Sequence, residues 1–221
     1  MPQRNVVLAA NEVYHVFNRS IAKAPLFSTK WNLNKVLEIA EFYMYPQVLR
    51  LSKLRLLPPD AKKEYIAVYR KKKPLVEIYS FAFMPNHYHF LLKQFSDNGI
   101  SRFISNVQNS FAKIYNLKND RNGALFQNSF KAKRAETEEQ FLHISRYIHL
   151  NPVTSYIIEF KNLETYPYTS FPYYAGENSN LTVNIEVILG LIGSKENYTQ
   201  FVSDQVEYQR ELALIKDLII E

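Results

Sequence analysis

Alternating apolar and polar positions predict strands in the first half of the chain. Residues 12–18 alternate and are rich in aromatic and β-branched side chains, which is typical of a half-buried strand. Residues 75–83 and 87–93 have the same character, and Met84-Pro85-Asn86 between them predicts a turn. These two strands should therefore form a hairpin, and we expect a fourth strand within residues 124–134.

Apolar spacings of three and four residues predict helices between these strands. The clearest helix has one apolar face made of Ile100, Phe103, Ile104, Val107, Phe111 and Ile114. We expect another helix over about 31–45, capped by Ser28 or Thr29, and a short one over about 60–70. The insertion-like segment 47–73, which contains the short helix, is rich in Lys and Arg.

Helical signals return in the last third of the chain. Thr137–Gln140 has the pattern of a capping box, so a helix should begin there and stop near Asn151, because Pro152 follows. A loop should then extend to about residue 180, followed by helices over about 184–193 and 196–219. The order of elements predicts an α+β fold, an antiparallel sheet with helices packed on one or both faces.

Composition and charge exclude some classes of function and favour others. The chain has 221 residues, no cysteine and a net charge of +6, so disulfides and thiol catalysis are excluded. Residues 1–134 carry a net charge of +14 and residues 135–221 a net charge of −8. This asymmetry favours a basic N-terminal part that binds a polyanion and an acidic C-terminal part exposed to solvent. A mildly basic protein without a nucleic-acid partner remains the alternative. No apolar stretch suits a membrane span and no secretory signal is evident, so we expect a cytoplasmic protein.

Two histidines form the first candidate site. His87 and His89 are two apart on an expected strand, so both side chains leave the same face, and Tyr88 between them points the other way. Two imidazoles placed in this way can bind one metal ion. The alternative is a pair of ordinary strand histidines.

A second candidate site lies on the expected helix after residue 137. His143, Tyr147 and Asn151 are spaced by four and share one face. An Asn oxygen suits Mg²⁺ or Mn²⁺, and a tyrosine beside such an ion could attack a polarised phosphate. The alternative is a half-buried tyrosine and a C-capping asparagine.

Three other residues have weaker signals. His15 lies on the first expected strand and is interpreted as structural, and His149 as a surface or packing residue. Tyr115, beside the apolar stripe of the long helix, is interpreted as core.

These segments resemble the single-tyrosine transposases with a His-hydrophobe-His motif, above all the REP-associated tyrosine transposases, which are related to insertion-sequence transposases. Residues 83–92 (FMPNHYHFLL) resemble their histidine strand, and residues 146–153 (RYIHLNPV) resemble their nucleophile helix. Shorter matches are VFNR at 16–19, LFQNSFK at 125–131 and YPYTS at 166–170. Together the matches span about 12–176.

The resemblance implies a ferredoxin-like sheet in a catalytic domain over residues 1–176, with 47–73 as an insertion and 177–221 as a C-terminal helical extension. It implies His87, His89 and Asn151 as ligands of Mg²⁺ or Mn²⁺. It also implies Tyr147 as the nucleophile that forms a 5′-phosphotyrosine and frees a 3′-OH. The substrate would be single-stranded DNA near a hairpin, bound by a monomer or homodimer at the bacterial nucleoid.

The DNA contacts that we expect are Arg19, Lys131, Lys133 and Arg134, in or beside the matching strand motifs. Asn128-Ser129 departs from the Gly-Arg often found there, which removes one basic contact. Two other functions stay open. One is a domesticated DNA- or RNA-binding module of the same fold that does not cut, and the other is a replication initiator or relaxase-like nickase.

Overall fold

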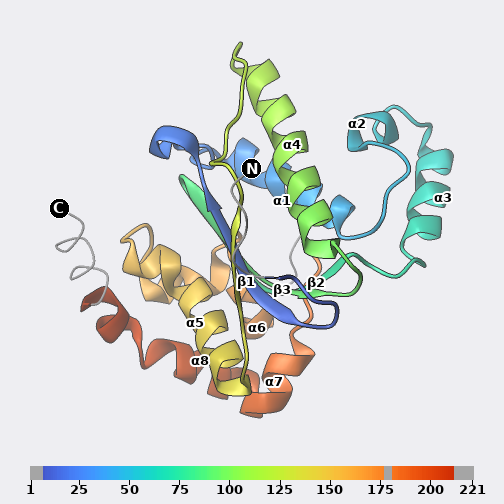
Figure 1. Cartoon of the computed structure of the whole chain (residues 1–221). Coiled ribbons are helices and arrows are strands. Elements are labelled where there is room, and N and C mark those ends of the chain that lie inside the picture. Colours follow the sequence, from blue (N-terminus) through green and yellow to red (C-terminus); the bar gives the residue numbers. More distant parts are fainter. Residues whose placement is uncertain (1–6, 177–180, 212–221) are drawn as a thin grey trace.

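A four-stranded antiparallel sheet forms the centre of the computed structural model, which describes residues 7–176 and 181–211 (Figure 1). The strands are β1 (Val13–Arg19), β2 (Val76–Met84), β3 (His87–Gln94) and β4 (Lys131–Arg134). Their order across the sheet is β2-β3-β1-β4. With one helical crossover after β1 and another after β3, this is the ferredoxin-like arrangement, so the predicted α+β fold class is confirmed.

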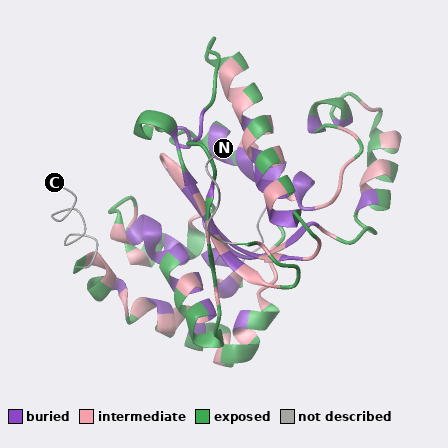
Figure 2. Ribbon diagram, viewed as in Figure 1, coloured by how far each residue is buried: buried purple, intermediate pink, exposed green. Residues whose placement is uncertain are grey.

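One face of the sheet is covered by α1 (Lys30–Tyr43) and α4 (Gly99–Lys118). The apolar stripe of α4 is buried from Ile100 to Phe111 as its spacing predicts, Ile114 is partly buried, and the stripe packs with Val36 and Leu37 of α1 and with Tyr14 and Val16 of β1. Thr29 caps α1 by accepting a hydrogen bond from the backbone N–H of Asn32. Figure 2 shows this layer as largely buried between the helices and the sheet.

The opposite face carries α5 (Glu138–Thr154), which packs on β2 and β3. Short elements follow it: η2 (Phe160–Thr165), α6 (Phe171–Ala175), α7 (Glu186–Ile192) and α8 (Lys195–Ser203). They share a second apolar core with α5, in which Ile148 and Leu150 contact side chains such as Tyr174 and Tyr198. Helices α1 and α4 therefore cover one face, and the helices after β4 cover the other.

The insertion expected at 47–73 lies beside α1 and α4, away from the sheet (Figure 1). It contains α3 (Pro59–Tyr69), close to the predicted bounds, and a one-turn helix α2 (Leu51–Leu54) that the sequence pattern did not predict. Leu51 and Leu54 are buried in the core against α1 and α4, so the insertion is anchored to the domain. A further short 3-10 turn, η1 (Ile21–Lys23), follows β1.

Several expected boundaries were wrong, and the physical reasons are local. The strand expected within 124–134 is present as β4 at the end of that range, and it begins only after Ser129, whose positive φ interrupts extended backbone. Leu125, Phe126 and Phe130 instead point into the core.

The helix after Thr137 also continues beyond its expected end, since Pro152 lies inside its last turn. A proline there removes one backbone N–H, and the helix still closes because Ser155 N donates to Asn151 O. The expected loop over 157–180 contains η2 and α6. The final helix, expected over 196–219, is present as α8 and, after a turn at 204–205, as a further helical segment over 206–211, while 212–219 lies outside the described residues.

No helix among the described residues is both long enough and apolar enough to cross a membrane. The boundary between the catalytic domain and the C-terminal extension falls at residues 177–180, outside the described residues. The division at 176 therefore stays a prediction, although α7 and α8 share one core with α5.

Candidate active site

The pairing of β1 with β3 gathers polar side chains on the α5 face of the sheet. In the antiparallel register, Phe17 lies opposite His89 and Arg19 lies opposite His87. Side chains alternate along each strand, so all four residues face α5, whereas Tyr88 and Phe90 face α1 and α4. The sequence-based expectation that Tyr88 points away from the two histidines is confirmed.

A pocket of about 250 Å³ opens on this face. Its lining comes from four separated segments of the chain and includes both histidines, Tyr147 of α5, and the two cations Arg19 and Lys131. Phe17, Asn18 and Gln127 complete the lining. The two candidate sites found in the sequence, the histidine pair and the helical tyrosine, therefore meet at one place.

His89 is buried and has one ring nitrogen without a partner. Its Nδ1 lies 2.9 Å from Nε2 of His15, while its Nε2 is buried and has no hydrogen-bond partner. Burial, aided by His15, His87 and Arg19, lowers the pKa of His89 well below its ordinary value. A neutral imidazole with an unpaired buried nitrogen is the form that binds a metal ion.

His87 is arranged in a similar way. Its Nδ1 lies 2.7 Å from Oδ1 of Asn86, which leaves Nε2 available. Burial lowers the pKa of His87 to about 4, and the charge of Arg19 contributes. Both histidines are therefore neutral at neutral pH, and each has a second polar group that can fix the orientation of its ring.

Tyr147 is 38% exposed and stands over the histidines. Its ring centroid lies 5.7 Å from that of His89 and 5.8 Å from that of His15, in edge contacts. Burial raises the pKa of the Tyr147 phenol, whereas a hydrogen bond from Asn151 and the charge of Arg19 lower it. The phenol is thus accessible from the pocket and close to a cation that can offset negative charge.

Asn151 and His143 share the helix but do not line the pocket. The Asn151 side chain is buried, and its Nδ2 donates to the backbone oxygen of Tyr147 at 2.8 Å. His143 lies instead at the α8 end of this face, where its Nδ1 is 3.2 Å from Arg146 and its ring contacts Phe201. The spacing by four therefore places these residues on one side of α5, but only Tyr147 opens into the pocket.

The four cations expected to contact DNA take different places. Arg19 and Lys131 line the pocket. Lys133 lies opposite His15 on the same face of the sheet. Arg134 points to the other face, opposite Tyr14, and forms an ion pair with Glu12 at 2.6 Å.

The sequence pattern indicated a structural residue at His15 and gave no sign of its contact with His89. His15 contacts His89 through a ring nitrogen, and burial together with the charge of Lys133 lowers its pKa to about 4. The available signal was the alternation of 12–18, which puts His15, Phe17 and Arg19 on one face. The register with β3, which brings His15 to His89, was not visible in the sequence.

His149 is a packing residue, and the alternative of a surface position was wrong. It is fully buried, with Nε2 2.6 Å from Ser170 Oγ and Nδ1 2.8 Å from the Tyr198 hydroxyl. Arg146, also in the RYIHLNPV segment, packs over Phe201 and donates to its carbonyl oxygen. Tyr115 is partly buried against the first core, as expected.

A four-stranded ferredoxin-like sheet, with two histidines of one strand facing a helical tyrosine, is the arrangement that the resemblance to the single-tyrosine transposase class implies. The comparisons with known proteins support this class. Residues 59–151 match the family described as "Transposase IS200 like", and this segment contains His87, His89, Tyr147 and Asn151.

The fold is similar to that in "Structure of the REP associates tyrosine transposase bound to a REP hairpin". The TM-score is 0.53 at 15% sequence identity, with 84% of this chain and 93% of that chain covered. No curated protein matches the chain. The resemblance to IS200-like and REP-associated tyrosine transposases, first seen in short motifs, is therefore confirmed.

Proposed function

We propose that this protein cuts and rejoins single-stranded DNA near hairpins through a covalent bond to Tyr147. The observation that carries the proposal is the convergence of Tyr147, His87, His89, Arg19 and Lys131 on one pocket. A binding module of the same fold would need the cations but not a tyrosine above two unprotonated imidazoles. The DNA hairpin in the similar solved structure supports the same class of substrate.

The two histidines fit a divalent ion. His89 has a buried ring nitrogen without a partner, and the His87 ring is oriented by Asn86. Among the described residues, no three His, Cys, Asp or Glu side chains form a metal-binding group. We propose His87, His89 and Oδ1 of Asn151 as ligands of Mg²⁺ or Mn²⁺, which when bound would polarise the scissile phosphate.

The chain's own groups supply the remaining chemistry. The Tyr147 hydroxyl gives up its proton to solvent as its oxygen attacks the phosphorus and forms a phosphotyrosine bond. The bond between phosphorus and the 3′ oxygen breaks, and that oxygen leaves with the electron pair and takes up a proton. Arg19 and Lys131 hold the phosphate and offset its charge. The reverse attack by a 3′-OH rejoins DNA without an external energy source, because the phosphotyrosine conserves the bond.

The test removes one oxygen atom. Tyr147→Phe leaves the ring contacts with His15 and His89, so fold and DNA affinity should stay within about twofold while the rate of cleavage falls by ~10³-fold or more. A denaturing gel with a labelled hairpin oligonucleotide and Mg²⁺ reports both cleavage and the covalent adduct.

Tyr115→Phe is the matched control and should leave cleavage and adduct unchanged. An adduct that maps to Tyr115, or that persists in Tyr147→Phe, would refute the assignment of the nucleophile. If wild type binds the hairpin tightly and forms no adduct, the non-cutting module becomes the better description. Monomer or homodimer, and association with the nucleoid, stay predictions.

A further inference from the structure

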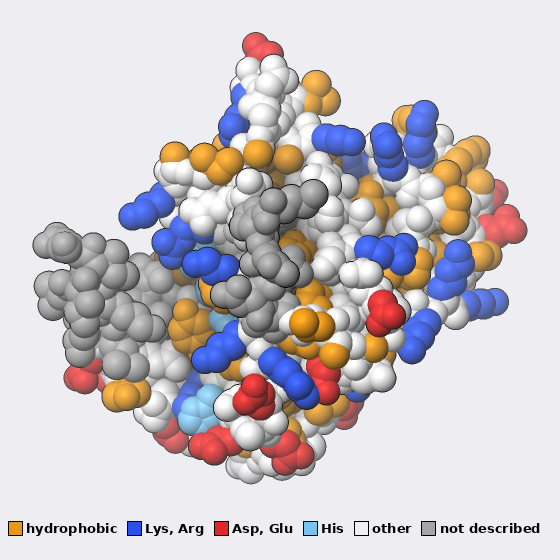
Figure 3. All heavy atoms as spheres, in the orientation of Figure 1, with side chains coloured by type: hydrophobic (Ala, Val, Ile, Leu, Met, Phe, Trp, Pro, Cys, Tyr) orange, Lys and Arg blue, Asp and Glu red, His pale blue; other side chains and the backbone are white. Residues whose placement is uncertain are grey.

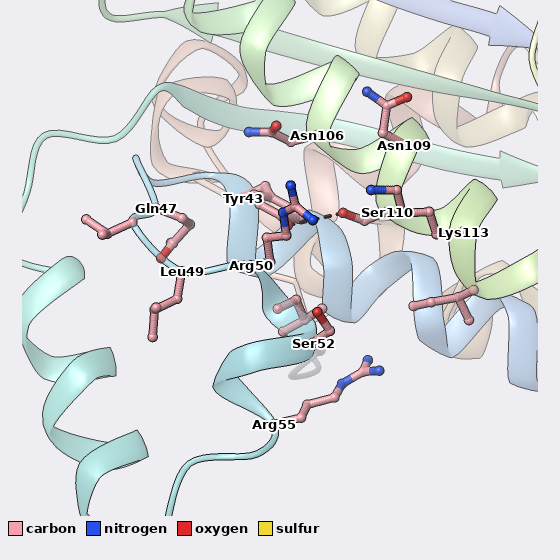
Figure 4. Close-up of a pocket in the computed structure, with 13 residues that line it drawn as sticks. Tyr43, Gln47, Leu49, Arg50, Ser52, Arg55, Asn106, Asn109, Ser110 and Lys113 are labelled. Atoms are coloured by element: carbon pink, nitrogen blue, oxygen red, sulfur yellow. Dashed lines mark hydrogen bonds between the residues drawn. The ribbon is translucent and has the colours of Figure 1, made fainter.

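A second pocket lies on the other side of the sheet from Tyr147. It has a volume of about 400 Å³ and opens between α4 and residues 47–55 of the insertion (Figure 4). Because α4 covers the face of the sheet opposite to α5, this pocket is separated from the candidate active site by the sheet itself. We call it the insertion pocket.

The insertion side of this pocket is held in place by a network around Tyr65. The Tyr65 hydroxyl accepts hydrogen bonds from the backbone N–H groups of Val48 and Leu49 and donates to Oε1 of Gln47. The Gln47 side chain in turn donates to the backbone oxygen of Phe42. With Leu51 and Leu54 buried below, this wall is a built part of the fold.

The α4 side presents a polar stripe. Asn106, Asn109, Ser110 and Lys113 follow a spacing of three and four, so they line one side of the helix next to its buried apolar stripe. They span about 10 Å along the helix, over which one DNA strand presents about three phosphates. In Figure 4 the Arg50 side chain extends from the insertion toward this stripe.

The insertion pocket carries positive charge, and no acidic side chain lines it. Arg50, Arg55 and Lys113 line the pocket. Arg55 pairs with Glu38. Arg50 and Lys113 have no ion-pair partner among the residues that the structure describes, and both are exposed. Two cations and several amide and hydroxyl groups therefore face a cavity suited to an anion.

The surrounding surface extends the same charge. Residues 47–73 contain nine Lys and Arg and two Asp and Glu, a net charge of +7, which exceeds the +6 of the whole chain. In Figure 3, Lys and Arg side chains gather over the part of the molecule that carries α2 and α3. A surface of this extent fits a polyanion better than a single phosphate.

We propose that the insertion pocket binds the phosphodiester backbone of a DNA segment other than the one being cut. The proposal rests on the proposed action on DNA, but it concerns a different face of the protein. The segment is either the flank of the cleaved molecule, led around the edge of the sheet, or a second DNA molecule. Such a site would hold DNA in place while the active site exchanges strands.

The test compares two charge-matched double variants of the full chain. Arg50→Gln with Lys113→Gln removes both uncompensated cations from the pocket. Lys71→Gln with Lys72→Gln removes two charges from the same insertion outside the pocket. Affinity for labelled hairpin DNA with long flanks is measured by fluorescence anisotropy at several salt concentrations, and thermal melting checks that each variant folds.

We expect the pocket variant to bind DNA roughly tenfold more weakly. The slope of log affinity against log salt concentration should also fall by about two, because two fewer counterions are released on binding. The control should change affinity less than about threefold. Cleavage of a minimal oligonucleotide that only spans the active site should be equal in both variants. Equal affinity of the pocket variant and wild type would overturn the inference and leave the proposed function untouched.

The remaining outcomes separate the two proposals. Weaker binding by the pocket variant in a protein that never forms an adduct would support the inference and refute the cutting function. If the affinity rises in a step as the flank is lengthened, with one DNA molecule bound per protein, the occupant of the pocket is the flank of the cleaved DNA. Two DNA molecules per protein identify a second duplex or strand. An RNA oligonucleotide bound tenfold more tightly than DNA through Arg50 and Lys113 would overturn the assignment to DNA.

Discussion

At the scale of single residues, three histidines on the α5 face share one chain of contacts. His15 touches His89, and the rings of His87 and His89 lie 5.1 Å apart. If Nε2 of His89 binds a metal ion, its Nδ1 carries the proton and donates to Nε2 of His15. His15 then has the role of a positioning residue that fixes both the tautomer and the ring of a ligand.

His15→Phe should therefore weaken Mn²⁺ binding by about 10- to 100-fold, because His89 loses the acceptor that orients it. His15→Gln, which can keep an acceptor near Nδ1, should recover part of the affinity. Isothermal calorimetry on the DNA-free protein measures this without relying on catalysis. Mn²⁺ affinities of His15→Phe and wild type within twofold would mean that His15 only packs, and loss of all binding in His89→Ala provides the reference.

At the scale of elements, α4 begins where the chain has no room for a side chain. Asn98 has a φ of 61° before the first turn, and Gly99 lies against the backbone of the segment leading into β2. A Cβ on Gly99 would be 2.4 Å from the carbonyl oxygen of Leu75, a contact that requires backbone movement. The start of α4 is thus fixed by a tertiary approach as well as by its own sequence.

Gly99→Ala should lower the free energy of unfolding by about 1–3 kcal/mol through this overlap. Gly190→Ala is the matched control, since Gly190 lies inside α7 with nothing near an added Cβ. That change should stabilise the protein by about 0.5–1 kcal/mol, because alanine favours helix. Urea denaturation measures both, and a neutral Gly99→Ala would show that Leu75 moves aside without cost.

Helix α5 has two roles in its layer: it presents Tyr147 to the pocket, and it packs between the sheet and the C-terminal helices. Its pocket side presents Tyr147, while Ser145 and His149 contact the hydroxyl of Tyr198 on α8. The Ser170 hydroxyl, which contacts His149, also accepts a hydrogen bond from the backbone N–H of Phe81 in β2. The helix that holds the candidate nucleophile is therefore held between the sheet and the C-terminal helices, which keeps Tyr147 over the histidines.

At the scale of the whole molecule, two cores lie on either side of the sheet, and the second is rich in tyrosine. Tyr174 is fully buried, its ring stacks on Tyr198 at 4.4 Å, and its hydroxyl donates to the backbone oxygen of Tyr79 at 2.7 Å. Burial raises the pKa of Tyr174 well above its ordinary value, and Tyr198 adds to the shift. Folding therefore opposes ionisation of this phenol.

The raised pKa predicts alkaline instability. Below pH ~10 the phenol is protonated in both states and pH has no effect. Above pH ~10 the unfolded chain ionises and the folded chain does not, so stability falls by about 1.4 kcal/mol per pH unit for each such tyrosine.

Tyr174→Phe should cost about 1 kcal/mol at neutral pH, from the lost bond to Tyr79, yet reduce the slope above pH ~10. Chemical denaturation at a series of pH values measures both effects. The exposed Tyr208→Phe should change neither. An unchanged alkaline slope in Tyr174→Phe would show that other groups control the transition.

The sequence by itself determined the elements with strong periodicity and the motifs that lie within them. The α4 stripe, the β2–β3 hairpin, the capping of α1 by Thr29 and the shared face of His87 and His89 all depend on neighbours within a few residues. For that reason the α+β class and the face that Tyr147 shares with Asn151 could be predicted from the spacing, whereas Tyr147 as nucleophile is implied by the resemblance of the motifs. The docking of the insertion depends on residues far along the chain, so the sequence indicated the insertion only by its composition.

Tertiary structure decided what depends on partners far along the chain. The register of β1 with β3 brought His15 to His89, 74 residues apart, and placed Arg19 opposite His87. Packing against α8 and Ser170 made His149 a buried residue, and burial of Pro152 and Val153 carried α5 past its predicted end. The insertion pocket exists only because α2 docks beside α4. Periodicity cannot specify such pairings, since many registers and dockings satisfy the same local pattern and only the packing of the complete core selects one.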